Sequence, residues 1–167
     1  ENPATLFMVA GDFLSPALGT KVFQGKQMTD VLGAAGVDLV TLGNHEFDMG
    51  PEILKKRIQE TKFAWVISNV REPKSGHPIG GAQEIFLRDL GGVKVGVLGL
   101  LTTDTEHSSK GGDGAKFLPE IAAAKAAVKA LKAKGAEVII ALTHLDLNSD
   151  KRLARAVPEI QLILGGH

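Results

Sequence analysis

Short apolar runs are the feature that most limits what this chain can fold into. Six of them are rich in β-branched and large apolar residues, and their hydrophobicity is nearly continuous instead of alternating. Strands that are covered on both faces have this pattern, because neither side of the strand meets water. The runs that we predict as strands are Thr5–Ala10, Val37–Leu42, Phe63–Ser68, Val93–Leu100, Val138–Thr143 and Ile160–Leu164.

A seventh strand is predicted over Glu84–Leu90, and it forms a hairpin with the run that starts at Val93. Gly91 and Gly92 separate the two segments. A pair of glycines suits the two-residue turns that close tight hairpins. We therefore expect these two strands to be antiparallel neighbours.

Amphipathic segments between the apolar runs predict helices. Proline is favoured at the first position of a helix, and Pro51 opens a segment in which Leu54 and Ile58 share a face. The longest predicted helix follows Pro119 and ends at Gly135, since glycine suits the turn after a helix. This longest helix is predicted over Glu120–Lys134, with an apolar stripe of Ile121, Ala124, Val128 and Leu131. Shorter helices are predicted over Gln27–Ala35 and over Asp150–Ala156, the second with Ser149 as its cap.

The order of these elements predicts an α/β fold with mixed sheet pairing. Strands alternate with helices, as in parallel βαβ units, apart from the single hairpin. The composition agrees, since 5% of the residues are aromatic and 20 residues are glycine. A core of Val, Ile, Leu and Ala, with glycine at the ends of elements, suits a layered α/β domain better than an all-β sandwich.

Charge and cysteine content argue against several classes of function. The 19 Lys and Arg residues balance the 19 Asp and Glu residues, which disfavours a nucleic-acid polymer as partner and electrostatic attachment to a membrane. No apolar run approaches the about 18 residues that a membrane span needs. Because the chain has 0 Cys, disulfides, thiolate zinc sites and cysteine nucleophiles are excluded.

Four of the predicted strands end in the same way. The apolar run stops at glycine or another small residue, and a side chain that can bind a metal follows. In α/β folds, ligands gather beyond the carboxyl ends of strands, because those ends open onto one edge. If the strands are parallel neighbours, one Asp, one Asn and three His converge there. The endings are Ala10-Gly11-Asp12, Leu42-Gly43-Asn44-His45, Leu142-Thr143-His144 and Leu164-Gly165-Gly166-His167, with a weaker version at Ser68-Asn69.

Each ending taken alone also has an ordinary structural interpretation. His144 is then a hydrogen-bonded histidine at a strand end, Asp12 a helix cap, and Gly43-Asn44 a common turn. Glu46 either orients that turn or is a surface carboxylate. Repetition at equivalent places, together with the compact Gly-Asn-His-Glu-Phe-Asp segment, favours a functional site.

The residue types limit the chemistry of such a site. Asp, Asn and imidazole without thiolate suit Mn, Fe, Co or Zn. Two cations about 3.5–4 Å apart would clamp a phosphoryl group and make a hydroxide nucleophile at neutral pH. His45 would face the substrate, while Asp48 would accept its other ring proton and keep the imidazole protonated. An imidazolium there stabilises developing charge or protonates the leaving oxygen.

In order and spacing, these motifs resemble the calcineurin-like metallophosphoesterases, and within them the branch of 5′-nucleotidases and 2′,3′-cyclic phosphodiesterases. That family carries the blocks Asp-x-His, Gly-Asp, Gly-Asn-His-Asp/Glu, a lone His and Gly-His-x-His. The extension Phe47-Asp48 and the segment Ser68-Asn69-Val70 indicate the nucleotidase branch. The matching blocks cover nearly the whole chain and are Gly11-Asp12, Gly43-Asn44-His45-Glu46, Thr143-His144 and Gly166-His167.

The resemblance implies a four-layer αββα sandwich with mixed sheets. It implies a phosphohydrolase that acts on 5′-nucleotides or 2′,3′-cyclic nucleotides through attack of a metal-activated hydroxide on phosphorus. Two divalent metal ions, Mn, Zn, Fe or Co, are the implied cofactors. The implied metal ligands are Asp12, which bridges both ions, Asn44, His144 and His167, and the implied catalytic dyad is His45 with Asp48.

Two blocks of the family are absent from this sequence. The chain starts at Glu1 without an Asp-x-His block, and it stops at His167 before the second His of Gly-His-x-His. We therefore expect residues 1–167 to be a partial catalytic domain. The first strand, the C-terminal substrate domain and part of one metal site are expected to lie outside it.

Two alternatives to the nucleotidase interpretation are open on the sequence. One is another metallophosphoesterase, such as a general phosphodiesterase or a protein phosphatase. The other is a non-catalytic binding or scaffold domain that keeps the fold and has lost the first metal site. The expected partner is a nucleotide or another phosphate ester, and the resemblance implies a periplasmic, secreted or cell-surface location.

Overall fold

The computed structural model describes residues 4–110 and 114–167. Its strands are β1 (Met8–Ala10), β2 (Leu39–Thr41), β3 (Ala64–Trp65), β4 (Val70–Arg71), β5 (Ile85–Leu90), β6 (Val93–Leu101), β7 (Lys116–Phe117), β8 (Val138–His144) and β9 (Leu162–Gly166). Its helices are α1 (Thr20–Phe23), α2 (Lys26–Ala34), α3 (Pro51–Glu60), α4 (Thr105–Ser108), α5 (Glu120–Ala133) and α6 (Leu147–Ala156), with 3₁₀ turns η1 (Asn44–Phe47) and η2 (Ile79–Gly81).

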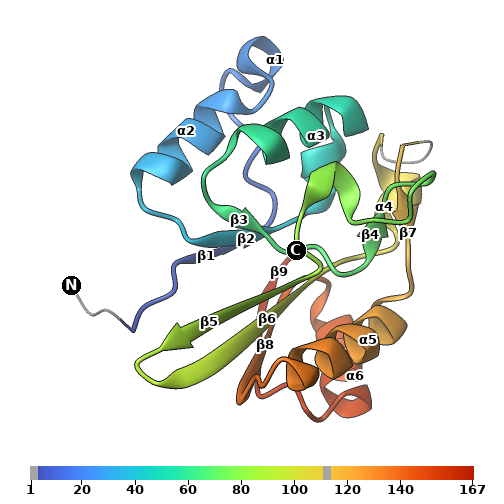
Figure 1. Cartoon of the computed structure of the whole chain (residues 1–167). Coiled ribbons are helices and arrows are strands. Elements are labelled where there is room, and N and C mark those ends of the chain that lie inside the picture. Colours follow the sequence, from blue (N-terminus) through green and yellow to red (C-terminus); the bar gives the residue numbers. More distant parts are fainter. Residues whose placement is uncertain (1–3, 111–113) are drawn as a thin grey trace.

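Two main sheets face one another in the part of the chain that the structure describes (Figure 1). The first has the order β1-β2-β3 and is parallel throughout. The second has the order β5-β6-β8-β9, with β5 antiparallel to β6 and the other pairs parallel. A short antiparallel pair, β4 with β7, lies to one side.

Helices cover the outer face of each sheet. Helices α2 and α3 lie over the first sheet, and α5 and α6 lie over the second (Figure 1). Buried apolar clusters fill the three spaces between these layers. Val40 lies in the cluster between the first sheet and its helices, Leu39 in the cluster between the two sheets, and Leu98 in the cluster between the second sheet and its helices. In the described residues this is the four-layer αββα sandwich with mixed sheets that the family resemblance implied.

The main predicted elements are present with shifted ends: β1, β2, β3 and β5 are shorter than predicted, whereas β6 and β8 extend one residue further. The hairpin turns at Gly91 and Gly92, with Leu90 paired to Val93 as expected. The glycine-rich, polar sequence of Thr102–Ala115 predicts a surface loop, but this segment contains α4, and β7 begins directly after it. These short elements give no periodic signal, so sequence patterns could not indicate them.

Two details of the helical predictions are wrong. Helix α6 starts at Leu147 and not at Asp150. Its N-terminal cap is Asp146 and not Ser149, because the Asp146 side chain accepts hydrogen bonds from the backbone N–H groups of Asn148 and Ser149. In α5, Ile121 is 36% exposed, and alanines complete the buried stripe instead. Small residues allow α5 to lie close to the sheet.

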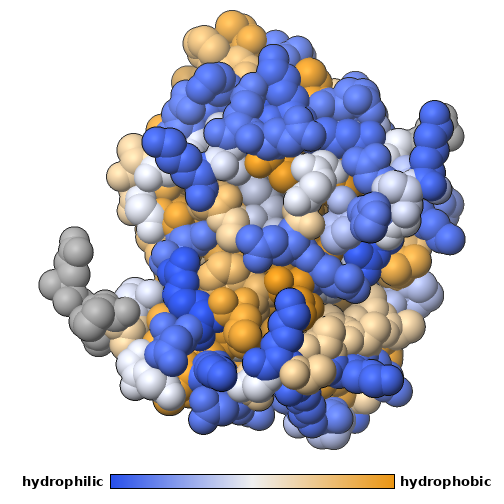
Figure 2. Space-filling model, in the orientation of Figure 1, coloured by the Kyte–Doolittle hydropathy of each residue, from blue (hydrophilic) through white to orange (hydrophobic). Residues whose placement is uncertain are grey.

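The surface is mostly polar over α2 and α3 and apolar at α1 (Figure 2). Leu18, Val22 and Phe23 are exposed there. None of the helices in residues 4–110 and 114–167 has the length and hydrophobicity that crossing a bilayer requires.

Candidate metal centre

The loop after β1 and the loop after β2 touch through their glycines. Gly11 has φ +81°, and a Cβ on it would lie 2.4 Å from the Gly43 backbone nitrogen. A Cβ on Gly43 would lie 2.2 Å from Asp12 Oδ1. Only residues without side chains permit this approach, which places the Asp12 carboxylate against the turn that carries Asn44 and His45.

Asp12 itself has a backbone conformation that few residues adopt. Its φ is +55°, in the left-handed region where Asp is tolerated better than most residues. Its Oδ1 accepts a hydrogen bond of 3.0 Å from the His45 backbone N–H. Burial raises the pKa of Asp12, but the hydrogen bonds from His144 and from the His45 backbone outweigh that effect, and the net shift is downward. The carboxylate is therefore held in its ionised form.

His144 and His167 approach Asp12 from the second sheet. His144 Nε2 lies 3.1 Å from Asp12 Oδ2 and 3.2 Å from His167 Nδ1. One potential ligand atom from each of these three residues lies within 4.8 Å of the other two. We call Asp12, His144 and His167 the Asp12 cluster. A close group of one carboxylate oxygen and two imidazole nitrogens suits a divalent transition metal.

The second ring nitrogen of His144 fixes the orientation of the ring. Nδ1 donates a 2.7 Å hydrogen bond to the carbonyl oxygen of Ala10, and the side chain is 2% exposed. Burial lowers the pKa of His144, but the hydrogen bonds to Asp12 and Ala10 outweigh it and raise the pKa overall. A metal bound to His144 Nε2 would replace the proton that Nε2 shares with Asp12 Oδ2.

Asn44 supplies the observation that best tests whether a metal fits here. Its Oδ1 is buried, and no residue in the described part of the chain gives it a hydrogen-bond donor. The His45 backbone N–H donates to Asp12 Oδ1, and a Cβ on Gly43 would collide with the same oxygen, so the backbone on both sides of Asn44 lies close to Asp12. A buried acceptor without a donor is costly, and a cation beside Asp12 would remove that cost. The donor set, two oxygens and two imidazole nitrogens without thiolate, fits Mn, Fe, Co or Zn.

His45 and Asp48 form a hydrogen-bonded pair within one turn. His45 Nδ1 donates to Asp48 Oδ2 at 2.9 Å. This hydrogen bond is the main cause of the raised pKa of His45, and burial opposes it. Because Nδ1 is occupied by Asp48, Nε2 is the ring nitrogen left for a ligand or a proton transfer. The pair is partly exposed, with 41% and 33% of the side chains accessible, so a substrate could reach it.

Glu46 is buried, so of its two sequence interpretations the orienting role is the correct one. Its side chain is 2% exposed and accepts hydrogen bonds from the backbone N–H groups of Gly43 (2.6 Å), Asp12 (2.7 Å), Phe13 (2.8 Å) and Leu14 (2.9 Å). Burial raises the pKa of Glu46 to about 7, against the pull of these donors. Glu46 thereby ties the Asp12 loop to the turn that carries Asn44 and His45.

Asn69 follows a predicted strand, but in the structure it directly precedes β4 and its amide group is occupied elsewhere. Its amide group exchanges two hydrogen bonds with the Leu101 backbone, donating at 2.7 Å and accepting at 2.9 Å. It therefore holds the end of β6 in place. The polar sequence around His77 and around His107 predicts that both are solvated surface histidines, and both are exposed in the structure.

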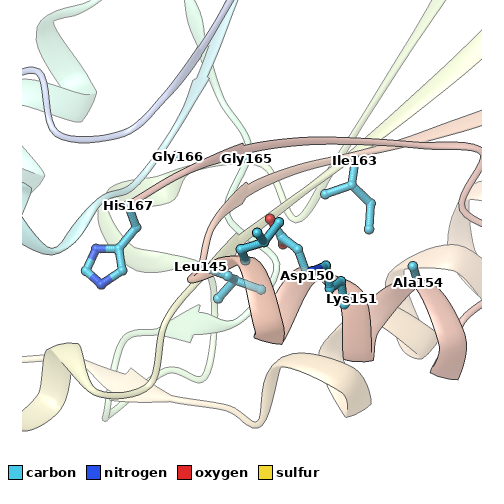
Figure 3. A pocket seen from close by; sticks show the side chains of 9 residues that line it. Leu145, Asp150, Lys151, Ala154, Ile163, Gly165, Gly166 and His167 are labelled. Carbon is cyan, nitrogen blue, oxygen red and sulfur yellow. The ribbon is translucent and has the colours of Figure 1, made fainter.

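An open pocket of about 570 Å³ lies beside the cluster, between β9 and α6 (Figure 3). Leu145, Ile163 and Ala154 form much of its wall, and Asp150 and Lys151 add charge. The pocket shares only His167 with the Asp12 cluster, and in Figure 3 the His167 ring points away from the α6 side chains. We therefore place the candidate chemistry at the Asp12 cluster, not in this pocket.

Comparison with known proteins decides the family. The family model described as calcineurin-like phosphoesterase matches residues 1–167. The chain belongs to the calcineurin-like phosphoesterase family. It is similar to the 5′-nucleotidase of Mus musculus, with 32% identity over 173 residues, and to the NAD 5′-nucleotidase of Haemophilus influenzae, with 33% identity over 167 residues. These matches cover 100% and 99% of this chain, and 30% and 27% of the relatives.

A solved structure agrees with the family assignment. The structure of a 5′-nucleotidase precursor from Thermus thermophilus superposes with a TM-score of 0.90 at 34% identity, covering 97% of this chain and 32% of that one. This calcineurin-like phosphoesterase chain thus spans about a third of the length of the relatives it matches. The family implies divalent metals, and the Asp12 cluster has the residues to hold one.

Proposed function

We propose that this chain is the metal-binding part of a phosphohydrolase that cleaves phosphate esters, with 5′-nucleotides or 2′,3′-cyclic nucleotides as substrates. The observation that carries the proposal is the meeting of Asp12, His144 and His167 at the ends of three strands. It is supported by the buried Asn44 Oδ1, which has no hydrogen-bond donor in the described residues and precedes a backbone N–H that donates to Asp12. The family match supports the same class of reaction.

The proposed metal ligands are Asp12, Asn44, His144 and His167. When bound, divalent metals in such a site supply Lewis acidity toward a phosphoryl oxygen and a nucleophile at neutral pH. Asp12 contributes an ionised carboxylate that its hydrogen bonds already orient. His144 contributes Nε2, because Nδ1 is committed to the Ala10 carbonyl.

The proposed role of His45 is to donate a hydrogen bond or a proton from Nε2. Asp48 accepts the hydrogen bond from Nδ1–H of His45 and so favours the imidazolium form. An imidazolium stabilises the charge that develops on phosphoryl oxygens, or protonates the leaving oxygen as the ester bond breaks. Asp48 acts through His45 and need not touch the substrate.

Nucleotides are proposed as substrates because similar proteins carry the names 5′-nucleotidase and NAD 5′-nucleotidase. A periplasmic, secreted or cell-surface location is proposed on the family resemblance alone.

The test is metal content and hydrolysis measured together on the whole protein. We expect protein reconstituted with Mn²⁺ to hydrolyse AMP or 2′,3′-cyclic AMP. His45→Ala should lower kcat by about 10²–10⁴-fold and keep the metal content of the parent. His107→Ala, which removes an exposed histidine that is not one of the proposed metal ligands, is the matched control and should behave like the parent.

Three outcomes would change the assignment. Bound metal without turnover of any phosphate ester would favour a binding or scaffold domain. Hydrolysis of bis(p-nitrophenyl) phosphate or phosphopeptides, but of no nucleotide, would favour a general phosphodiesterase or protein phosphatase. Equal loss of metal and activity in His45→Ala would make His45 a structural or ligating residue.

A further inference from the structure

Ser15 contacts the His45–Asp48 pair from the opposite loop. Its Oγ donates a 2.6 Å hydrogen bond to Asp48 Oδ2, the same oxygen that accepts the Nδ1 proton of His45 at 2.9 Å. Ser15 lies 33 positions away in the sequence, on the loop after β1. No motif in the sequence singles it out.

We propose that Ser15 is a positioning residue for His45, acting through Asp48. A carboxylate at the surface can rotate about its side-chain torsions, and one donor does not fix it. A second donor at Oδ2, held by a different loop, keeps this oxygen directed at His45 Nδ1 and so keeps Nε2 as the working nitrogen. The inference rests on the proposed function for its effect on rate, but not for its effect on the imidazole.

The loop that carries Ser15 is held firmly on both sides of it. Glu46 accepts hydrogen bonds from the backbone N–H groups of residues 12–14, which precede Ser15. Thr20 Oγ1 donates to the Leu14 carbonyl and accepts from the Ala17 N–H. The Ser15 backbone is therefore placed independently of its own hydroxyl.

Both ends of the Ser15–Asp48 contact belong to one closed unit. Glu46 lies in η1 and Asp48 directly follows it. The same turn therefore accepts the backbone hydrogen bonds of residues 12–14 through Glu46 and the hydrogen bond of Ser15 through Asp48. Removing the Ser15 hydroxyl leaves the Glu46 contacts intact. We therefore expect Ser15→Ala to fold normally while Asp48 gains rotational freedom.

The first experiment is a double-mutant cycle on the whole protein with Mn²⁺ and AMP. Ser15→Ala should lower kcat about tenfold, as expected for loss of a hydrogen bond to a charged group, with little change in KM or metal content. In the Asp48→Ala background the same change should have no further effect, since the group that Ser15 positions is gone. Thr29→Val is the matched control, because Thr29 is as buried as Ser15, at 6% against 7% exposed, and its hydroxyl donates to the Lys26 carbonyl within α2.

The second readout does not require turnover. The ¹⁵N chemical shifts of the His45 ring, measured on neutral imidazole in the metal-free whole protein, report which nitrogen carries the proton. We expect the Nδ1–H form in the parent and in Thr29→Val. In Ser15→Ala the shifts should move toward the mixed tautomers of a free imidazole.

The two readouts separate failure of this inference from failure of the proposed function. If the parent hydrolyses no ester, the proposed function fails, and the ring shifts alone decide the role of Ser15. Unchanged shifts in Ser15→Ala would overturn the inference. The inference would also be overturned if the fold-losses of kcat in Ser15→Ala and Asp48→Ala multiplied in the double variant, because Ser15 would then act independently of Asp48.

Discussion

At the residue scale, Glu46 best explains how the candidate centre is built. Burying a carboxylate costs several kcal/mol unless hydrogen bonds replace its water, and here four backbone N–H groups do so. Those donors come from the two loops that carry Asp12 and Asn44. The carboxylate therefore acts as a fixed internal partner for both loops, and its position three residues after Gly43 allows it to reach back to the start of η1.

Glu46→Gln should lower the free energy of unfolding by about 2–3 kcal/mol, because an amide offers one accepting oxygen and leaves buried N–H groups facing an NH₂ group. Urea denaturation of the variant and the parent measures this difference. Glu106→Gln, at an exposed position, is the control and should match the parent. An unfolding free energy for Glu46→Gln equal to that of the parent would show that these contacts contribute little.

At the element scale, the segment that leads into β2 connects both sheets through Asp38. Asp38 Oδ2 accepts a 2.9 Å hydrogen bond from the Phe7 N–H just before β1, and Oδ1 pairs with Arg88 of β5 at 2.5 Å. The Phe7 hydrogen bond first, and Arg88 second, lower the pKa of Asp38, and burial opposes them. This contact thus aligns strands from different layers.

The lowered pKa of Asp38 gives a pH-dependent contribution to stability. A carboxyl whose pKa is lower in the folded state stabilises the fold above its unfolded pKa, near 3.8, and the contribution disappears as the pH falls through the folded value. Asp38→Asn should therefore lose about 1 kcal/mol at pH 7, and its stability should fall less than that of the parent on acidification below pH 4. Denaturation curves at pH 7, 4 and 2.5 measure this, with the exposed Asp104→Asn as control. Parallel pH profiles for Asp38→Asn and the parent would contradict it.

At the scale of the whole molecule, the candidate centre lies where the two sheets meet. Asp12 and Asn44 follow strands of the first sheet, whereas His144 and His167 belong to or follow strands of the second. The bond from His144 to the Ala10 carbonyl links the sheets at this point. Gly166 allows the approach, since a Cβ there would lie 2.8 Å from that same carbonyl oxygen.

A metal at this junction should therefore stabilise the whole sandwich. Mn²⁺ or Zn²⁺ at a hundredfold excess over its dissociation constant should add about 2.7 kcal/mol to the stability, because it binds the folded state alone. The expected result is a rise in Tm that chelation by EDTA reverses. His144→Ala should lose the rise, and His107→Ala should keep it. A rise that survives in His144→Ala would place the metal elsewhere.

The sequence alone determined the features that depend on neighbouring residues. Buried runs, the Gly91-Gly92 hairpin and the polar side chains after each strand follow from periodicity and from backbone freedom at glycine, which are local properties. The sequence indicated that these strand ends could converge if the strands were parallel neighbours, but it did not show which strands are neighbours. In the structure Asp12 and Asn44 come from one sheet and His144 and His167 from the other. Only the packing of the two sheets brought Asp12 together with His144 and His167.

The pairing of β1 with β2 in the first sheet brings together the loops that follow these strands, and so decided the role of Glu46 and the contact on which the proposed role of Ser15 rests. Each role depends on contacts across more than 30 positions of sequence, 34 between Asp12 and Glu46 and 33 between Ser15 and Asp48. No pattern of adjacent residues reports such a contact. Burial and hydrogen-bond geometry arise only when the layers close around the loops, because both are properties of the space between segments.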